Sequence, residues 1–219
     1  GSSDKKVYLF DKDSNTPLWS FTGDYPVHSV SISADGEYIV AGYDGGSNSK
    51  VYLFGKDSST PLWNYTPSDF VRSVAISADG EFIVAGSDNN KVYLFDKDSN
   101  ETLWIYTTGD NVYSVAISAD GEYIAAGSWD KKIYLFDKNS STPLWIYETG
   151  GAVESVTVSE NGEYIAAGSD DDNVYLFNKN SSIPLWSCAM NDNVRLVAIS
   201  ADGKYITTGT GYPDNKVYL

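Results

Sequence analysis

The chain has 219 residues, of which 42% are hydrophobic, and its formal net charge at pH 7 is −15. This length is enough to bury a sizeable core. The negative charge repels nucleic-acid phosphates and anionic lipid headgroups, which disfavours binding to nucleic acid or to a membrane surface. The single cysteine, Cys188, excludes a disulfide within the chain. No apolar run approaches the roughly 18 residues that would span a membrane.

Two features recur along the chain from the N-terminus: a four-residue motif and a tryptophan. Gly1-Ser2-Ser3 resembles an expression scar and lies outside the repeat. Lys-Val-Tyr-Leu, with small changes, then recurs with its apolar part beginning at Val7, Val51, Val92, Ile133, Val174 and Val217. Trp19, Trp63, Trp104, Trp145 and Trp186 are spaced by 44, 41, 41 and 41 residues. A fixed period of this length predicts a repeat architecture, so we expect residues 5–219 to form a single domain.

One copy, residues 71–106, shows the repeating unit. Its apolar pieces VRSVAIS, EFIVAGS, KVYLF and LWIY are four to seven residues long and are separated by turn residues. Short pieces rich in Val, Ile, Tyr and Phe predict β-strands, and Ala78-Asp79-Gly80 predicts a hairpin turn. In KVYLF both faces of the strand are apolar, so neighbouring copies must cover both faces of each sheet. We therefore predict an all-β fold, a β-propeller of four-stranded antiparallel blades.

The order of the strands raises the question of how the ring closes. If the four strands of a repeat are called A to D, the chain begins with C (7–10) and D (18–21). Four complete repeats follow, and the chain ends with A (194–199), B (204–208) and part of C (217–219). We expect the N- and C-terminal strands to pair and to close a five-bladed ring, which leaves Lys216–Leu219 redundant. Alternatively, the chain is part of a larger propeller, and the surplus C-terminal strand allows self-association with another chain.

The copies differ mainly at one end of the predicted propeller. In antiparallel order, the D–A and B–C connections share one end of every blade. Aromatic and Arg side chains are common anchors of protein interfaces, and loops on a rigid scaffold often bind partners. We therefore predict a partner-binding surface there, and free drift of turn residues is the alternative. Its residues are Tyr25, His28, Tyr43, Phe70, Arg72, Tyr113, Trp129, Glu154, Arg195 and Tyr212.

Signals for catalysis and for bound metals are weak. The lone His28 and the lone Cys188 offer no pairing of a base with a nucleophile. Asp11-x-Asp13-x-Asn15 begins like a calcium loop, but it lacks the Gly at position six and the Glu at position twelve that such a loop requires. The sequence contains no zinc-ligand spacing and no Gly-rich phosphate loop. We expect no enzyme activity, no metal and no cofactor.

Two segments resemble known propeller repeats. Ser73–Asn89 (SVAISADGEFIVAGSDN) resembles the first half of a WD40 repeat, and Val7–Trp19 (VYLFDKDSNTPLW) resembles the repeat of quinoprotein-like propellers. The chain has no Gly-His dipeptide and carries Phe-Asp, Phe-Gly or Phe-Asn where WD40 repeats carry Trp-Asp. The resemblance implies a propeller of the prokaryotic type whose blades cohere by packing of Trp, Tyr and Phe. The oxidoreductase activity of quinoproteins depends on particular site residues, which the fold alone does not supply.

Three hypotheses for the function follow. The first is a non-catalytic scaffold that binds a protein or peptide across the variable end. The second is a multivalent glycan or small-ligand binder with a site between each pair of blades, which would repeat its site residues in every copy. The third is an excised or engineered repeat fragment with no partner of its own. Because the candidate residues differ between copies, we favour the first hypothesis. We also expect a soluble prokaryotic protein that is cytoplasmic, attached to the cell surface or secreted.

Overall fold

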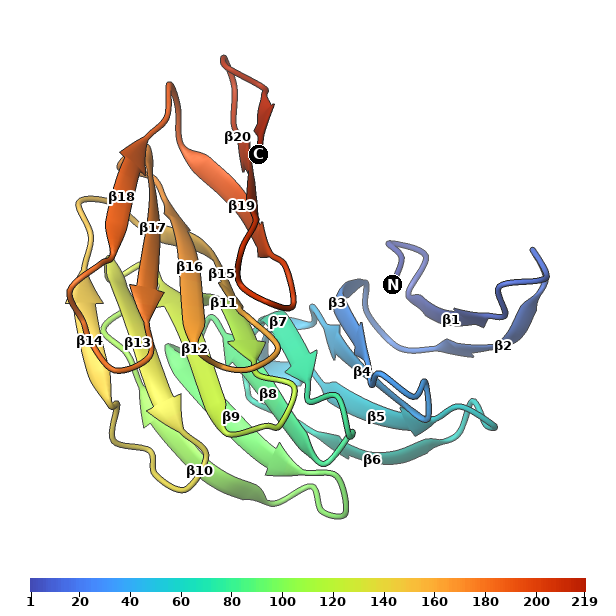
Figure 1. Ribbon diagram of the computed structural model, residues 1–219. Coiled ribbons are helices and arrows are strands. Elements are labelled where there is room, and N and C mark those ends of the chain that lie inside the picture. Colours follow the sequence, from blue (N-terminus) through green and yellow to red (C-terminus); the bar gives the residue numbers. More distant parts are fainter.

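The computed structural model describes all residues 1–219, and it consists of strands apart from one short 3₁₀ turn, η1 (Gly46–Asn48) (Figure 1). Four sheets have four antiparallel strands each, joined in chain order. They are β3 (Val27–Ile32), β4 (Tyr38–Tyr43), β5 (Val51–Gly55) and β6 (Pro61–Tyr65); β7 (Val71–Ile76), β8 (Phe82–Ser87), β9 (Lys91–Asp96) and β10 (Thr102–Thr107); β11 (Val112–Ile117), β12 (Tyr123–Ser128), β13 (Lys132–Asp137) and β14 (Trp145–Glu148); and β15 (Val153–Val158), β16 (Tyr164–Ser169), β17 (Asn173–Asn178) and β18 (Trp186–Ala189). These sheets confirm the predicted all-β class and the predicted four-stranded blades.

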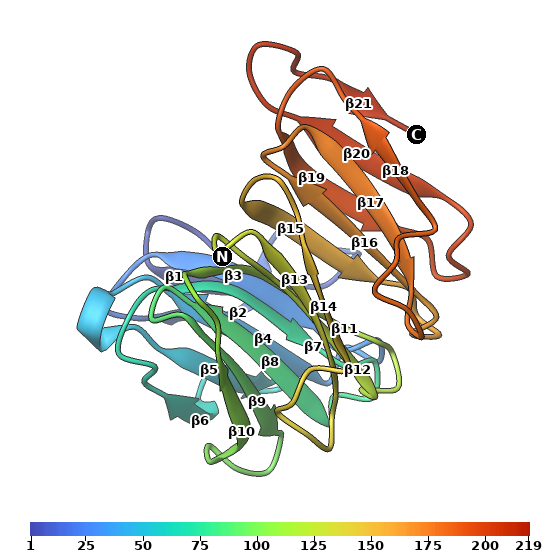
Figure 2. The same cartoon turned by 90° about the vertical axis from the view of Figure 1, so that its left-hand side faces the viewer.

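Two incomplete sheets stand at the ends of the row of blades. The N-terminal part-blade is β1 (Lys6–Phe10) with β2 (Pro17–Thr22), and the C-terminal part-blade is β19 (Val194–Ile199), β20 (Ile206–Thr210) and β21 (Val217–Tyr218). The sheets follow one another around an open arc, with the two part-blades on either side of the opening (Figure 1). The view turned by 90° also shows the part-blades apart (Figure 2). Since β1 pairs only with β2 and β20 pairs with β21, closure of the ring through the terminal strands stays a prediction.

The turn between strands A and B is built by its own side chains. Ser118 Oγ donates to Asp120 Oδ1 at 2.6 Å and accepts from the Tyr123 N–H at 3.0 Å. Gly121 takes a φ of 71°, a conformation that glycine adopts without steric cost. Equivalent pairs of serine bonds occur at Ser33, Ser77, Ser159 and Ser200. The Ser-Ala-Asp-Gly phrase therefore fixes each hairpin locally, before any contact between blades is considered.

Neighbouring blades are joined by the repeated tryptophan. Trp104 in strand D of one blade packs on Phe136 in strand C of the next, with ring centroids 5.2 Å apart and ring planes at 36°. Its Nε1 donates to the Lys138 carbonyl at 2.9 Å. The same two contacts join Trp19 to Phe54 and Lys56, Trp63 to Phe95 and Lys97, and Trp145 to Phe177 and Lys179. The period seen in the sequence is thus the period of an interface between blades.

Close to the inner strands, small residues let the sheets approach each other. A Cβ added at Gly127 would lie 2.6 Å from Val153 Cγ1 of the next blade. Ser114 Oγ accepts from the Val156 N–H at 3.0 Å. The main buried clusters each combine side chains from two neighbouring sheets. The core is therefore a series of layers between blades rather than one central cluster.

Candidate binding surface

The D–A connection and the B–C loop of each blade lie side by side on one face of the arc. Backbone hydrogen bonds join them: Asp88 N–H donates to the Phe70 carbonyl at 2.9 Å, and Asp170 N–H donates to the Ala152 carbonyl at 2.8 Å. Equivalent bonds occur between Asp44 and Pro26, Trp129 and Asn111, and Gly211 and Asn193. We call this face of the arc the loop face. It consists of the residues between β2 and β3 and between β4 and β5, with their equivalents in the later blades.

A β-bulge directs the second residue of strand A toward this face. The register shifts between Val71 and Ser73, so that Arg72 stands as the extra residue of its strand. The same shift places His28, Tyr113, Glu154 and Arg195. Such bulges redirect a side chain out of the regular alternation of a strand. The second position of strand A, which holds four different residue types in five copies, is therefore a bulge position.

Arg72 is fixed by an acidic residue of its own blade. The Arg72 Nε donates to both carboxylate oxygens of Asp88 at 2.9 Å, and this pairing raises the pKa of the guanidinium. The guanidinium also lies 5.2 Å from the ring centroid of Phe70 and 5.6 Å from that of Tyr113. Cation–π distances in this range are attractive. Arg72 thus connects its own blade to the strand A residue of the next blade.

The contacts continue through two aromatic rings. Tyr113 stacks on Trp129 with ring centroids 4.9 Å apart and ring planes at 18°. Trp129 Nε1 then donates to Glu154 Oε1 of the following blade at 3.2 Å. Trp129 nevertheless remains 40% exposed. The indole is therefore held in place by its neighbours and still presents surface to solvent.

The series of contacts along the loop face ends with a carboxylate and an arginine. Arg195 Nη1 lies 3.1 Å from Glu154 Oε2 and 3.3 Å from Asp170 Oδ1, although the latter oxygen makes no hydrogen bond. Burial raises the pKa of Glu154, and the nearby Asp170 raises it further, while Arg195 acts in the opposite direction. We call Phe70, Arg72, Asp88, Tyr113, Trp129, Glu154, Asp170 and Arg195 the rim network.

The titration of Glu154 provides a test of this arrangement. We expect its midpoint to lie above the ordinary value of 4.5, so the folded state binds this proton more readily than the unfolded chain does. The stabilisation from that proton is present below the unfolded pKa and is lost as pH rises through the folded pKa. In Arg195→Ala the midpoint should move still higher, because a cation that favours the charged carboxylate is removed. NMR titration of the Glu154 side chain measures both, and a midpoint at or below 4.5 in the parent chain would contradict the packing described.

Six of the ten predicted surface residues belong to the rim network: Phe70, Arg72, Tyr113, Trp129, Glu154 and Arg195. The half-buried Tyr25 lies apart from it, where its hydroxyl accepts from Asn48 Nδ2 at 3.4 Å. His28 is exposed at its own bulge, and Tyr212 is 87% exposed in the last B–C loop. These three are on the loop face, and no hydrogen bond, ion pair or ring contact joins them to the network.

The prediction for Tyr43 is wrong. Tyr43 is the last residue of β4 and is 1% exposed, within the cluster that includes Tyr52 and Phe54. Its ring contacts that of Phe21 edge-on at a centroid distance of 6.4 Å. A side chain in this position cannot reach a partner. The loop-like sequence YDGG concealed the fact that its first residue is still part of the strand.

Sequence reasoning missed Asp88 and left Asp170 out of the surface. A usable signal was present, because the second residue of strand A and the first residue after strand B are 16 positions apart in every copy. These pairs are His28 and Asp44, Arg72 and Asp88, Tyr113 and Trp129, Glu154 and Asp170, and Arg195 and Gly211. One pair is oppositely charged, one is aromatic, and one, Glu154 with Asp170, carries two like charges. The like-charged pair is bridged by Arg195 of the next sheet.

Other kinds of site find little support. No group of three or more His, Cys, Asp or Glu side chains is arranged to hold a metal ion. None of the helical structure is long and apolar enough to cross a bilayer. What the rim network offers is charged, aromatic and hydrogen-bonding groups held on a firm scaffold.

Comparison with known families agrees with the blade architecture. Residues 101–137 and 141–178 match the family described as WD domain, G-beta repeat. Residues 3–118 match the family described as outer membrane protein assembly factor BamB. No individual curated protein matches the chain. These matches confirm the resemblance to WD40 and quinoprotein-like repeats, and because the second covers 116 of the 219 residues, the chain belongs to the BamB family of propeller repeats.

Proposed function

We propose that the loop face binds a protein or peptide segment rich in basic side chains, and that the protein is a non-catalytic scaffold. The observation that carries this proposal is the rim network, which runs without interruption through three complete blades into the C-terminal part-blade and differs in each. A single extended partner would meet a different set of groups along such a line. A multivalent glycan binder would instead present the same groups in every blade.

The charge of the loop face supports a basic partner. Its loops contain Asp24, Asp44, Asp69, Asp88, Asp110, Asp130, Asp170, Asp171, Asp172, Asp192 and Asp214. These acids outnumber the cations of the same face, which are Arg72, Arg195, Lys50, Lys131 and Lys216, and Arg72 and Arg195 are already paired with Asp88 and Glu154. Complementary charge speeds association and selects among partners.

Exposed aromatic surface provides the anchor. Trp129 is stacked on Tyr113, so it loses little conformational freedom when a partner covers it. Large aromatic side chains of this kind dominate the energetics of many interfaces. The family description, an assembly factor, also supports a role in holding another protein. WD40-type propellers typically mediate protein interactions, which agrees with the same reading.

A random peptide display library provides the test. Peptides selected on the parent chain should be enriched in Lys and Arg, and their affinity should fall with rising salt. Trp129→Ala and Tyr113→Ala should each weaken binding by about tenfold or more, as for aromatic anchors. Asp98→Ala changes an exposed residue in a C–D turn on the opposite face of the arc. It serves as the control and should leave peptide affinity unchanged. Peptides that bind the parent chain and the two aromatic variants equally would refute the proposal.

A further inference from the structure

The two ends of the arc are the two halves of one interface between blades. Inside the arc, every Trp of strand D has a Phe of strand C and a lysine carbonyl opposite it, as described above for Trp104. Every Gly of strand B likewise has valines of the next strand A opposite it. At the C-terminal end, Trp186 and Gly209 lack the partners that follow in the chain. At the N-terminal end, Phe10 lacks a tryptophan, and Val27 is met only by the terminal Gly1.

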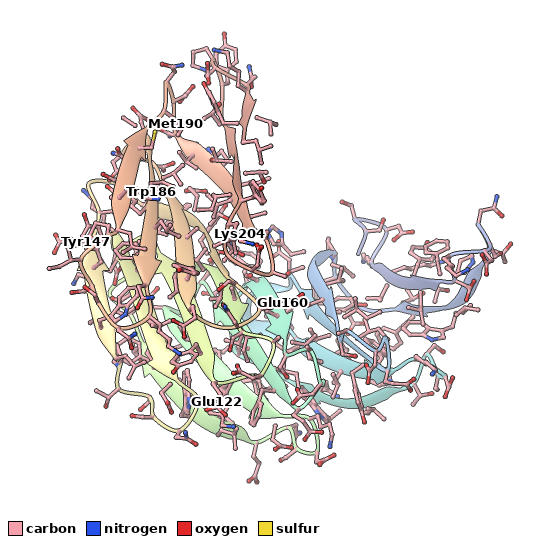
Figure 3. All side chains as sticks on the ribbon, viewed as in Figure 1. Glu122, Tyr147, Glu160, Trp186, Met190 and Lys204 are labelled. Atoms are coloured by element: carbon pink, nitrogen blue, oxygen red, sulfur yellow. The ribbon has the colours of Figure 1, made fainter.

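The C-terminal end carries the half that contains tryptophan. Trp186 is 42% exposed, and its Nε1 takes part in no hydrogen bond, unlike that of the four earlier tryptophans. With Cys188 and Ile206 it lines an open hollow of about 350 Å³. Figure 3 shows Trp186 and Met190 at this end of the arc, with Lys204 on the turn before β20. A Cβ at Gly209 would meet no atom within 4 Å.

The N-terminal end carries the complementary half. Phe10 is 52% exposed, whereas Phe54, Phe95, Phe136 and Phe177 at the same place in strand C are fully buried. Val30 is 45% exposed, whereas Val74, Val115, Val156 and Val197 are buried. No indole donates to the carbonyl of Lys12, which occupies the place of Lys138. The two partners that Trp186 lacks at the C-terminal end, a Phe ring and a Lys carbonyl, are therefore present at the N-terminal end without an indole of their own.

We propose that two copies of this chain associate head to tail by completing one blade between them. In this shared blade, β19 and β20 of one copy pair with β1 and β2 of the next. Trp186 then packs on Phe10 and donates to the Lys12 carbonyl. Leu196, which is 69% exposed, packs on Val30, and Gly209 takes the place that Gly1 holds against Val27. The interface repeats the Trp–Phe and Gly–Val contacts already present four times within the chain, except that Leu196 replaces the serine whose Oγ accepts a valine N–H in each internal interface.

A second copy fits better than the chain's own N-terminus. The four internal Trp–Phe contacts are nearly identical, with centroid distances of 5.2–5.5 Å and ring planes at 34–36°. These contacts set the curvature of the arc, and at that curvature the part-blades remain apart (Figure 1). Bringing them together would require every interface to change. A second copy reaches the same surface with none changed.

Strand β21 does not prevent the association. It pairs with β20 at only two positions, Thr208 with Tyr218 and Gly209 with Val217, whereas β16 and β17 pair at five. The phrase Lys-Val-Tyr-Leu occurs both in β1 and at residues 216–219. The longer β1 of a second copy can therefore replace β21 on the edge of β20 with the same side chains.

Besides Leu196, two positions make the shared blade weaker than the internal ones. Cys188 stands where Tyr147 packs on Phe177, so less aromatic surface would cover Phe10. Lys204 stands where Glu163 pairs with Lys179, so it would face Lys12. We therefore expect association that depends on protein concentration, which makes it accessible to measurement.

Sedimentation velocity over a range of protein concentrations tests the proposal. The mass should rise above 23.9 kDa in steps of one chain. Trp186→Ala should raise the dissociation constant roughly thirtyfold, as for a tryptophan anchor. Lys204→Glu should lower it about threefold by creating an exposed ion pair, and Cys188→Tyr should lower it as well. Trp129→Ala, on the loop face, is the control and should leave it unchanged.

Two further experiments identify the strands involved. Removal of residues 216–219 should preserve association, because β1 replaces β21. A short bismaleimide should link Tyr8→Cys to the native Cys188 between chains, and the link should disappear in the additional Cys188→Ser variant. A chain that stays monomeric at every concentration would overturn the proposal. So would a cross-link formed only within one chain, or loss of association on removing residues 216–219.

Discussion

Trp104→Ala is expected to lower the free energy of unfolding by about 3 kcal/mol, toward the lower end of the range for removing a large aromatic side chain from a core. The substitution removes the indole from Phe136 and deprives the Lys138 carbonyl of its donor. It therefore opens a gap between two blades and leaves an acceptor without a partner. Urea denaturation followed by circular dichroism measures the loss.

Trp186→Ala is the matched control, because it changes the same position of the last complete blade. No following Phe packs on Trp186 within the chain, so the loss should be less than about 1 kcal/mol, as for other partly exposed side chains. Both variants should be measured at low protein concentration, where chains are separate. Equal losses would mean that contacts between blades do not account for the effect of Trp104.

Gly127→Val is expected to destabilise the protein by about 3 kcal/mol, at the upper end of the usual cost of overpacking. Even a Cβ at this position would lie 2.6 Å from Val153 Cγ1 and 3.0 Å from Val156 Cγ1. Both neighbours are β-branched and have little freedom to move away. The blades would have to separate at their inner strands. Thermal and urea unfolding should both report the loss.

Gly209→Val is the corresponding control. It adds the same side chain at the equivalent place in β20, where a Cβ meets nothing within 4 Å. We expect a change within about 0.5 kcal/mol, because valine favours strands more than glycine does and meets no neighbouring atom here. If Gly209→Val were as damaging as Gly127→Val, the cause would be the strand itself rather than the neighbouring blade.

The repeat was the part of the structure that sequence reasoning could predict best. Trp104 and Phe136 recur at a fixed spacing because they form one interface that the fold uses several times. Ser118 and Asp120 form bonds within a single turn, so their meaning can be read locally. A feature that is both local and repeated leaves a clear pattern in the sequence.

Features that depend on pairs of distant residues were harder to predict. Tyr43 is buried because Gly23 leaves room for it: a Cβ at Gly23 would lie 2.2 Å from Tyr43 Cε1. Other copies have Pro67, Thr108, Thr149 and Met190 at the place of Gly23, and Ser or Thr at the place of Tyr43. Only comparison of both positions together shows that the tyrosine at one position goes with the glycine at the other.

The rim network was predicted as a set of residues but not as a connected structure. The sequence placed Arg72 and Trp129 on one surface by counting strands. It did not show that Tyr113 lies between them or that Asp88 fixes Arg72, because these contacts depend on the angle between successive blades. That angle is set by packing, and the sequence alone does not give it.

The layered core has a consequence for how the protein opens. Each buried cluster involves only two adjoining sheets, so stability is approximately a sum of nearest-neighbour contributions. No single cluster holds all the blades together, so loss of one does not unfold the whole chain at once. Amide exchange should therefore be fastest in the outermost strands and slowest in β7–β13, with protection declining toward both termini. Gain or loss of a whole unit during evolution would change the length of such an array while leaving every remaining contact as it was.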